Sequence, residues 1–263
     1  LNATLDISRM RKTSMAVFFV DVVAAFDSVL HSFIIDLELS DESILYLMGR
    51  LNLPSECFAD LCAALRAPSA LSAAGVPAHL QGVISDILTD NWFLIENNPN
   101  PCTINRSTKQ GDPLADLLFN FFVAVILKQI RSALTEQGFG VPYTPVSTTL
   151  FGAQEPGVIT DVSYVDDGTF FHEIIDNNKA LHDMQCMTSI VARTFYAHAL
   201  LPNFKKGKSE WMLVLRGIAA VAVRHTIFVV MKALIMCQVY HSHWVSAHVV
   251  PHYKHLGNHT TPS

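Results

Sequence analysis

Two adjacent acidic residues, Asp166 and Asp167, separate two apolar runs, and this pattern constrains the fold more than any other in the chain. The apolar residues of the first run are Val158, Ile159, Val162, Tyr164 and Val165, and the second opens at Gly168 and contains Phe170 and Phe171. Two such runs around a tight turn predict a β-hairpin with the acid pair at its tip. Neighbouring carboxylates repel each other, and two Mg²⁺ ions bridging a triphosphate would neutralise them. The alternative is an ordinary turn, because Asp side chains bond to nearby backbone.

The composition allows a substantial buried core. The chain has 263 residues, of which 50% are hydrophobic and 16% charged, so one large domain or two small ones can form. The net charge of -5 argues against a free-standing nucleic-acid-binding protein, which usually carries a basic surface, unless other segments supply the basic groups. Five scattered cysteines without a CxxC pair indicate neither a zinc site nor a disulfide framework, and they favour a reducing, intracellular compartment.

The start of the chain predicts a fragment of a longer protein, and its apolar segments predict no membrane span. No apolar signal-peptide region opens the sequence, and the first residue is Leu1, so we expect a piece of a longer protein. The stretch 212–240 is apolar, but Arg216, Arg224 and Lys232 interrupt it. No unbroken run reaches the roughly 18 residues of a membrane span, and we expect a buried strand followed by a helix.

Hydrophobic periodicity predicts the elements of the first part of the chain. Residues 16–22 form a short, continuous apolar run that is typical of a strand buried on both faces. Residues 41–66 predict two helical pieces, with Ser40 as the N-cap and Pro54 at the break. Residues 67–81 are rich in Ala, Ser, Gly and Pro and predict a connector.

The rest of the chain continues the alternation of strands and helices. The predicted elements are strands at 92–95 and 102–104, a helix from 112 to 133, a loop over 138–157, a helix over 176–200 and a strand over 211–215. The helix from 112 is apolar nearly all round, which predicts a central position. This order predicts an α+β fold with helices packed on one face of an antiparallel sheet.

Several histidines gather near the end of the sequence, at His241, His243, His248, His252, His255 and His259. Their spacing matches no zinc signature. We expect them to lie in a solvated tail.

A third acid, Asp21, stands where the first predicted strand ends. A carboxylate at the end of a buried strand is unfavourable unless it is paired or bound to a metal. Beside Asp166 and Asp167 it would complete an oxygen-rich site for two hard cations. The alternative is an N-cap for the following helix; we favour a cap or another structural role for Asp27, and the metal for Asp21.

Two further segments have polar residues placed for ligand binding. In Lys109-Gln110-Gly111-Asp112-Pro113, a flexible glycine precedes a predicted helix start, where phosphate groups bind well, although an ordinary loop-to-helix junction explains the pattern equally well. Residues 203–210 form a basic turn. Such a turn is usually solvated, and the alternative is a phosphate contact or a proton donor.

Taken together, five blocks resemble the palm of a reverse transcriptase, an RNA-directed DNA polymerase of the retroelement kind related to non-LTR retrotransposons and group II introns. The blocks are Phe19-Val20-Asp21 through Ala25-Phe26-Asp27, Lys109 through Leu114 with Leu118-Phe119-Asn120, Tyr164-Val165-Asp166-Asp167, Asn203 through Glu210, and Tyr253 through Gly257. In order, they are similar to the first acidic motif, the QGDP motif, the YxDD signature, the block that typically ends in Lys-Thr-Glu, and the primer grip. The resemblance implies a single palm-like domain over 1–263 with partial fingers at 67–110, and no thumb or accessory nuclease domain.

The resemblance also implies the catalytic set. Asp21, Asp166 and Asp167 would hold two Mg²⁺ ions, or Mn²⁺ in their place, and the backbone carbonyl at Val22 would add a ligand. Lys208 is the implied general acid for the pyrophosphate leaving group, with Lys206 as the second candidate.

The remaining implied residues bind the substrates. Phe26 occupies the sugar-gate position, where an aromatic ring excludes a ribose 2′-hydroxyl, and Gln110 and Gly111 would line the nucleotide pocket. The residues implied in primer and template binding are Lys109, Tyr253, Lys254, Leu256 and Gly257, although His255 stands where the family commonly has a second aromatic.

The implied activity is the addition of dNTPs to a primer 3′-hydroxyl on an RNA or DNA template. The implied partners are the RNA template, a DNA primer, dNTPs and the missing fingers, thumb and endonuclease segments of a longer polyprotein, in the nucleus if the element is eukaryotic and active. Two alternatives stay open. One is a catalytically dead retroelement fragment, and the other is an RNA-dependent RNA polymerase, against which Phe26 argues.

Overall fold

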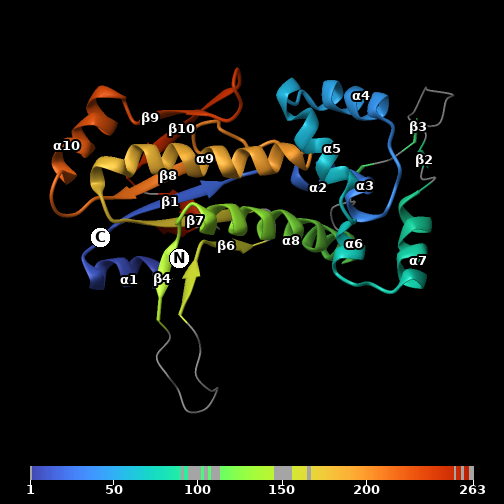
Figure 1. The fold of residues 1–263 in the computed structure, drawn as a ribbon, viewed down its shortest axis with the longest axis horizontal. Helices are drawn as coiled ribbons and strands as arrows, with labels where there is room; N and C mark the ends of the chain where they lie inside the picture. Colours follow the sequence, from blue (N-terminus) through green and yellow to red (C-terminus); the bar gives the residue numbers. More distant parts are fainter. Residues whose placement is uncertain are drawn as a thin grey trace, which may run out of the picture. The chain divides into compact units, whose positions relative to one another are not determined.

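The computed structural model describes residues 2–89, 92–93, 102–103, 106–107, 113–144, 156–164, 167–251, 253–255 and 258–260 (Figure 1). The chain forms two compact units. Unit 1 comprises Leu1–Asp21, Ile130–Ala192 and Pro202–Ser263, and unit 2 comprises Val22–Gln129 and Arg193–Leu201. Two long helices, α8 (Pro113–Glu136) and α9 (Ala180–Ala197), contribute residues to both units. The single domain with partial fingers at 67–110 stays a prediction.

Unit 1 is built on a six-stranded sheet with the strand order β6-β7-β1-β8-β10-β9. The strands are β6 (Asp161–Tyr164), β7 (Asp167–Ile174), β1 (Ser14–Val20), β8 (Glu210–Val214), β10 (Trp244–Val250) and β9 (Leu234–Gln238). β1 is antiparallel to both β7 and β8, but β10 runs parallel to β8. The sheet is therefore mixed, and the prediction of an antiparallel sheet is wrong at this one pairing.

The pairing of β10 also corrects the prediction of a solvated tail. Val245, Ala247 and Val249 are buried, and they alternate with more exposed neighbours along β10, as expected for a half-buried strand. His248 lies within this strand, opposite Glu210 of β8 and Leu234 of β9. The tail prediction failed because the histidines mask an alternating apolar pattern.

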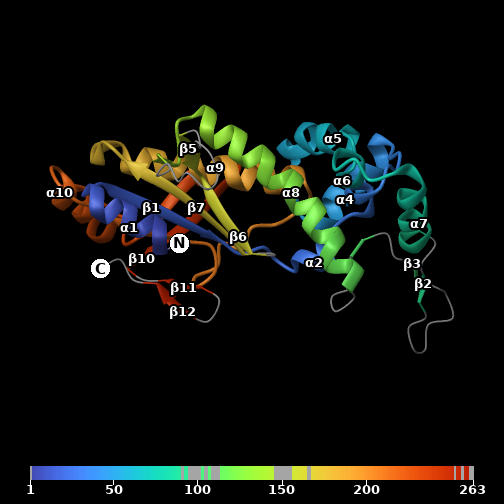
Figure 2. The same ribbon diagram turned by 90° about the horizontal axis from the view of Figure 1, so that it is seen from below.

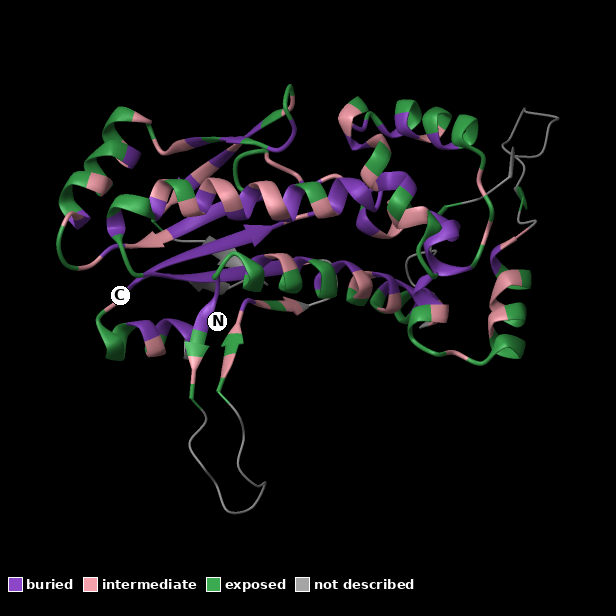
Figure 3. Ribbon diagram, viewed as in Figure 1, coloured by how far each residue is buried: buried purple, intermediate pink, exposed green. Residues whose placement is uncertain are grey.

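The strand β1 confirms the predicted buried run, since all seven of its residues are buried (Figure 3). On one face of the sheet, the ring of Phe18 stacks on that of Trp211, with 4.6 Å between the ring centroids. The indole Nε1 of Trp211 donates a hydrogen bond to Thr188 Oγ1 of α9 at 3.0 Å. The predicted strand over 211–215 and the predicted helix over 176–200 are thus both present, and α9 covers this face.

The opposite face of β1 carries Met15, Val17 and Phe19, which pack with Phe171 and with Leu5 of α1 (Asn2–Arg11). Figure 2 shows α1 and α9 on opposite sides of the sheet. Helices therefore cover both faces in unit 1, and the prediction of helices on one face is wrong. The physical reason is that β1 has large apolar side chains in both alternating sets, so each face must be shielded from water.

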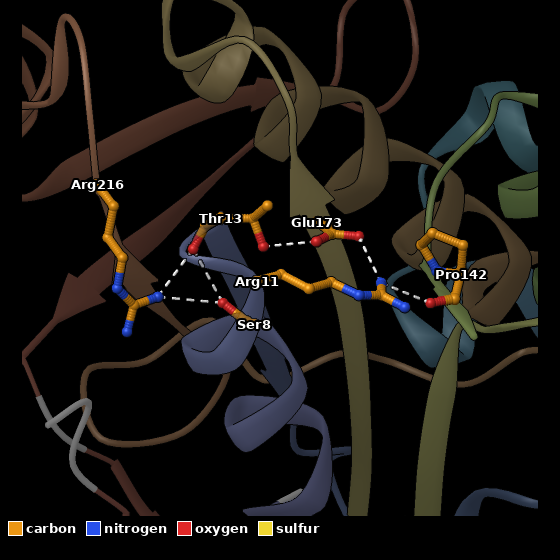
Figure 4. Close-up of polar contacts among 6 residues, drawn as sticks. All are labelled: Ser8, Arg11, Thr13, Pro142, Glu173 and Arg216. Atoms are coloured by element: carbon orange, nitrogen blue, oxygen red, sulfur yellow. Dashed lines mark hydrogen bonds and ion pairs between the residues drawn. The ribbon is translucent and has the colours of Figure 1, made fainter. Parts of the chain in front are cut away.

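A polar cluster closes one end of the β1–β7 pair (Figure 4). Glu173 of β7 is buried, and it accepts hydrogen bonds from Thr13 and, at 3.1 Å, from Arg11 Nη1. Nearby, Arg216 Nη1 donates to Ser8 Oγ at 3.1 Å and to the Thr13 carbonyl at 2.8 Å. A buried carboxylate needs such partners, because an unpaired one is strongly destabilising.

The segment predicted as a loop over 138–157 is partly a strand pair. β4 (Val141–Tyr143) pairs antiparallel with β5 (Gly157–Ile159), and residues 145–155 lie outside the described residues. The Gly and Pro residues of this segment hide the short strand in the sequence pattern. Val141, its first residue, is fully buried.

Unit 2 contains mainly helices. Its elements are α2 (Ala25–Ser28), α3 (His31–Ile34), α4 (Asp41–Leu51), η1 (Ser55–Cys57), α5 (Phe58–Arg66), α6 (Ala70–Ala73), α7 (Ala78–Leu88), β2 (Trp92–Phe93), β3 (Cys102–Thr103), the first part of α8 and the last part of α9. The predicted N-cap is confirmed, because Ser40 Oγ accepts a hydrogen bond from the Ser43 amide at 3.3 Å. β2 and β3, which lie within the predicted strands at 92–95 and 102–104, pair antiparallel.

The predicted connector over 67–81 is wrong in part, since it contains α6 and the start of α7. Alanine is the best helix former, and Ser69 Oγ accepts a hydrogen bond from the Ser72 amide at 3.4 Å, which caps α6. Composition alone therefore understated the helical content of this segment.

The helix α8 spans Pro113–Glu136, close to the predicted helix over 112–133, but it is not buried all round. Leu118, Phe122 and Ile126 are buried, whereas Leu117 is 51% exposed. Within the described residues, Leu114–Glu136 is the one helix long and apolar enough to cross a membrane by length and composition. A core helix passes the same test, and the buried stripe of α8 is that of a helix packed on one side.

The apolar stretch 212–240 follows the predicted order of a strand and then a helix. It contains β8, then α10 (Ala220–His225) continued by the π-helix η3 (Thr226–Val230), and finally β9. The segment that Arg216, Arg224 and Lys232 interrupt therefore forms several short elements and no single long helix.

We expect the buried contact between Trp211 and Thr188 to stabilise unit 1. Thr188→Val keeps the side-chain shape but leaves the indole N–H without its acceptor, so the free energy of unfolding should fall by about 1–3 kcal/mol. Thr226→Val is the matched control. Both threonine hydroxyls donate to the carbonyl four residues earlier, Thr188 at 2.8 Å and the exposed Thr226 at 3.1 Å. Urea unfolding of both variants checks this, and equal losses would contradict it.

Candidate active site

The pairing of β1 with β7 brings Asp21 and Asp167 to the same end of the sheet. Val20 is the Cα partner of Gly168, Asp21 directly follows Val20, and Asp167 directly precedes Gly168. Asp21 therefore follows the last residue of β1 and Asp167 is the first residue of the adjacent β7, so both acids lie at the same end of this strand pair. Both residues are partly exposed to solvent. Two carboxylates that lie far apart in the sequence thus share one end of unit 1.

The predicted acidic hairpin is confirmed by the pairing of β6 with β7, in which Tyr164 is the partner of Asp167. Val165 and Asp166, which join the two strands, lie outside the described residues. Arg131 of α8 holds the hairpin through Asp161, with Nε to Oδ1 and Nη2 to Oδ2 both at 2.8 Å. The Asp161 side chain is 2% exposed, and its hydrogen bonds raise the pKa of the Arg131 guanidinium. Such a two-point ion pair fixes geometry as well as charge.

Both carboxylate oxygens of Asp21 have partners from the turn that precedes β8. Lys208 Nζ lies 3.2 Å from Oδ1, and Asn203 Nδ2 donates to Oδ2 at 3.0 Å. The backbone is held as well, because the Asn203 amide donates to the Asp21 carbonyl at 2.8 Å, and the Asp21 amide donates to Ser209 Oγ at 3.1 Å. The orientation of Asp21 is therefore set by residues 203–209.

The turn itself is shaped by one glycine. Gly207 has a φ of +84°, in the left-handed region, and its amide donates to Glu210 Oε1 at 2.7 Å. Glu210 opens β8 and is the partner of Phe19 in β1. The turn therefore stays at the same end of the sheet as Asp21. The solvated-turn alternative fits the exposed Lys205 but not Lys208, which forms an ion pair with Asp21.

The donor chemistry at this end of the sheet fits a hard divalent cation. Asp21 and Asp167 offer carboxylate oxygens, which Mg²⁺ prefers. No group of three or more His, Cys, Asp or Glu that could hold a metal is found among the described residues. Asp166, the third carboxylate of the predicted set, is outside that part of the chain. Two Mg²⁺ ions at this position therefore stay a prediction.

Val22, the predicted backbone ligand of the metal, and Phe26, the predicted sugar gate, belong to unit 2. Val22 is buried, and Phe26 is partly buried with its ring stacked on Phe119 of α8, at 4.3 Å between centroids. Asp27 caps no helix through its side chain in the described structure; it accepts a hydrogen bond from Ser107 Oγ at 3.3 Å, a structural role.

The other predicted binding residues are only partly described. Tyr253 and Lys254 lie in β11 (Tyr253–His255), which pairs antiparallel with β12 (Asn258–Thr260). The predicted residues outside the described part are Lys109, Gln110, Gly111, Leu256 and Gly257. Their roles stay predictions.

Sequence reasoning assigned no individual role to Asn203 or Ser209, which hold Asp21. Their only local signal is a polar residue at either end of a basic turn. The contact between Asn203 and Asp21 spans 182 residues, so no short motif could reveal it.

Comparison with models of known protein families gives no match, and comparison with curated proteins gives no match either. The assignment of a function therefore depends on the residues and their geometry.

We expect the turn that holds Lys208 to need its glycine. An alanine in place of Gly207 has open space around its Cβ but an unfavourable φ, so Gly207→Ala should lower the free energy of unfolding by about 1–2 kcal/mol. Gly49→Ala is the control, because its Cβ also meets open space, in helix α4; this change should stabilise by about 0.5–1 kcal/mol. Denaturant unfolding measures both, and a neutral Gly207→Ala would contradict the argument.

Proposed function

We propose that the protein is an RNA-directed DNA polymerase of the retroelement kind, with a palm-like sheet and partial fingers. It would add dNTPs to a primer 3′-hydroxyl on an RNA or DNA template. The observation that carries the proposal is the register of β1 and β7, which brings Asp21 beside the acidic hairpin. In this proposal, the sheet holds acidic residues from two distant segments at the same end of adjacent strands.

The residues of unit 1 have separate roles in this proposal. Asp21 and Asp167, together with Asp166, would bind the cations through carboxylate oxygens, and Asn203 would keep the Asp21 carboxylate oriented. When bound, two divalent cations lower the pKa of the primer hydroxyl and neutralise the pyrophosphate leaving group. Lys208, with its ammonium beside Asp21, would donate a proton or a hydrogen bond to pyrophosphate.

The residues of unit 2 and of the late strands would select and hold the substrates. Phe26 would exclude the ribose 2′-hydroxyl, and its stacking on Phe119 limits the freedom of the ring. Gln110 and Gly111 would contact the nucleotide, and Lys109 the template or primer. The proposed primer contacts in and beside β11 are Tyr253, Lys254, Leu256 and Gly257.

A second candidate is a retroelement-derived fragment without catalytic activity. The observation in its favour is a set of strongly exposed apolar residues near α10, where Ile175 is 95%, Ile218 94% and Val221 79% exposed. Exposed apolar side chains that adjoin one another are a feature of partner interfaces and of destabilised proteins. Primer extension separates the two candidates.

We expect at most weak extension of a DNA primer on an RNA template with Mg²⁺ and dNTPs, and loss of that activity in Asp21→Asn. A neutral amide replaces a carboxylate that the cations require, so the rate should fall by a factor on the order of 10³ or more. Asp116→Asn, an exposed acid in the first turn of α8, is the control and should keep the parent rate. Absence of activity in the parent protein would favour the inactive fragment, and an active Asp21→Asn would remove the proposed metal site.

We expect Phe26 to set the choice of sugar. Phe26→Ala should raise the efficiency of rNTP incorporation relative to dNTP by about tenfold or more, because the cavity left by the ring accepts a 2′-hydroxyl. Phe26→Tyr keeps a ring at this position and should retain the preference for dNTPs. Competitive single-nucleotide incorporation measures the ratio, and equal use of both sugars by the parent protein would overturn the gate.

A further inference from the structure

The ion pair between Lys208 and Asp21 occupies the carboxylate that the proposed function assigns to a cation. Lys208 Nζ lies 3.2 Å from Asp21 Oδ1, and the side chains are 50% and 25% exposed, respectively. The other oxygen, Oδ2, is held by the neutral amide of Asn203. One oxygen of Asp21 is thus bound by a charged group that solvent ions can reach and replace, and the other by a group without charge.

An ammonium group and a divalent cation cannot share this oxygen without strong repulsion. At equal distance, a +1 and a +2 charge repel each other twice as strongly as two unit charges. The Lys208 side chain is long, flexible and half exposed, so it can move away, whereas Asn203 is fixed through its backbone as well as its amide. The amide does not oppose the cation, and it can keep Oδ2 in place throughout.

We propose that Lys208 is the counter-ion of Asp21 in the cation-free protein and that an incoming divalent cation displaces it. This inference rests on the proposed function, because it takes Asp21 as a cation ligand. Displacement frees the ammonium group only when the site is loaded, so cation binding and the availability of Lys208 to the phosphates of a nucleoside triphosphate are coupled. By linkage, removal of the lysine charge strengthens cation binding, although the same change weakens contact with the triphosphate.

The test measures Mn²⁺ binding to the full chain, without nucleotide or nucleic acid, from the electron paramagnetic resonance signal of the free ion. Lys208→Gln should bind Mn²⁺ about two- to fivefold more tightly than the parent, the range expected for an exposed ion pair that no longer competes. Lys208→Arg keeps the charge and should retain the parent affinity. Lys205→Gln, an exposed lysine of the same turn, removes an equal charge without the contact and should change affinity less.

The outcomes separate this inference from the proposed function. If the parent binds Mn²⁺ and Asp21→Asn does not, the metal site stands, and unchanged or weaker binding by Lys208→Gln then overturns the displacement alone. An equal gain in Lys205→Gln and Lys208→Gln also overturns it, because the effect would then be one of net charge. If Asp21→Asn binds Mn²⁺ as well as the parent, both the metal site and the displacement fail.

Discussion

The buried strand β1 is the element on which the rest of unit 1 depends. It has a hydrogen-bonded neighbour on each edge and apolar contacts on both faces. Because side chains alternate along a strand, a slip of one residue would exchange the sets that contact α1 and α9. The set with Phe18 stacks on Trp211, and the set with Val17 packs with Leu5, so the two are not interchangeable. Packing therefore specifies the register, and the register places Asp21 beside Asp167.

The carboxylates at the two ends of the β1–β7 pair differ in burial and in their charged partners, and this contrast supports the proposed function. At one end, Glu173 is buried and bound by Arg11 and Thr13, as expected of a structural ion pair. At the other end, Asp21 and Asp167 are partly exposed, and the charged partner of Asp21 is a half-exposed lysine. At the first end, the charge of Glu173 is neutralised by an arginine of the protein. At the second end, the carboxylates stay accessible to solvent and to dissolved cations.

Local sequence patterns predicted the elements that are stabilised by residues close to them in the sequence. The apolar run of β1, the β6–β7 hairpin and the capped helix at Ser40 all follow from neighbouring residues. Elements decided by distant pairing were missed. β10 has a histidine and a serine among its alternating apolar residues, and only its pairing with β8 and β9 makes it a sheet strand. The helix α6 lies in the predicted connector for a different reason, since the Ala, Ser, Gly and Pro content of residues 67–81 gives no sign that Ser69 caps a helix.

The amino-acid sequence alone predicts which residue types end the strands: Asp21 after one apolar run, the acid pair between two others, and a basic turn before β8. Which of these residues contact one another depends on the packing of distant segments in the fold. Asn203 and Lys208 contact Asp21 across more than 180 residues. The physical reason is that register and side-chain contacts between distant segments depend on how whole faces pack, and such contacts leave no trace in local periodicity.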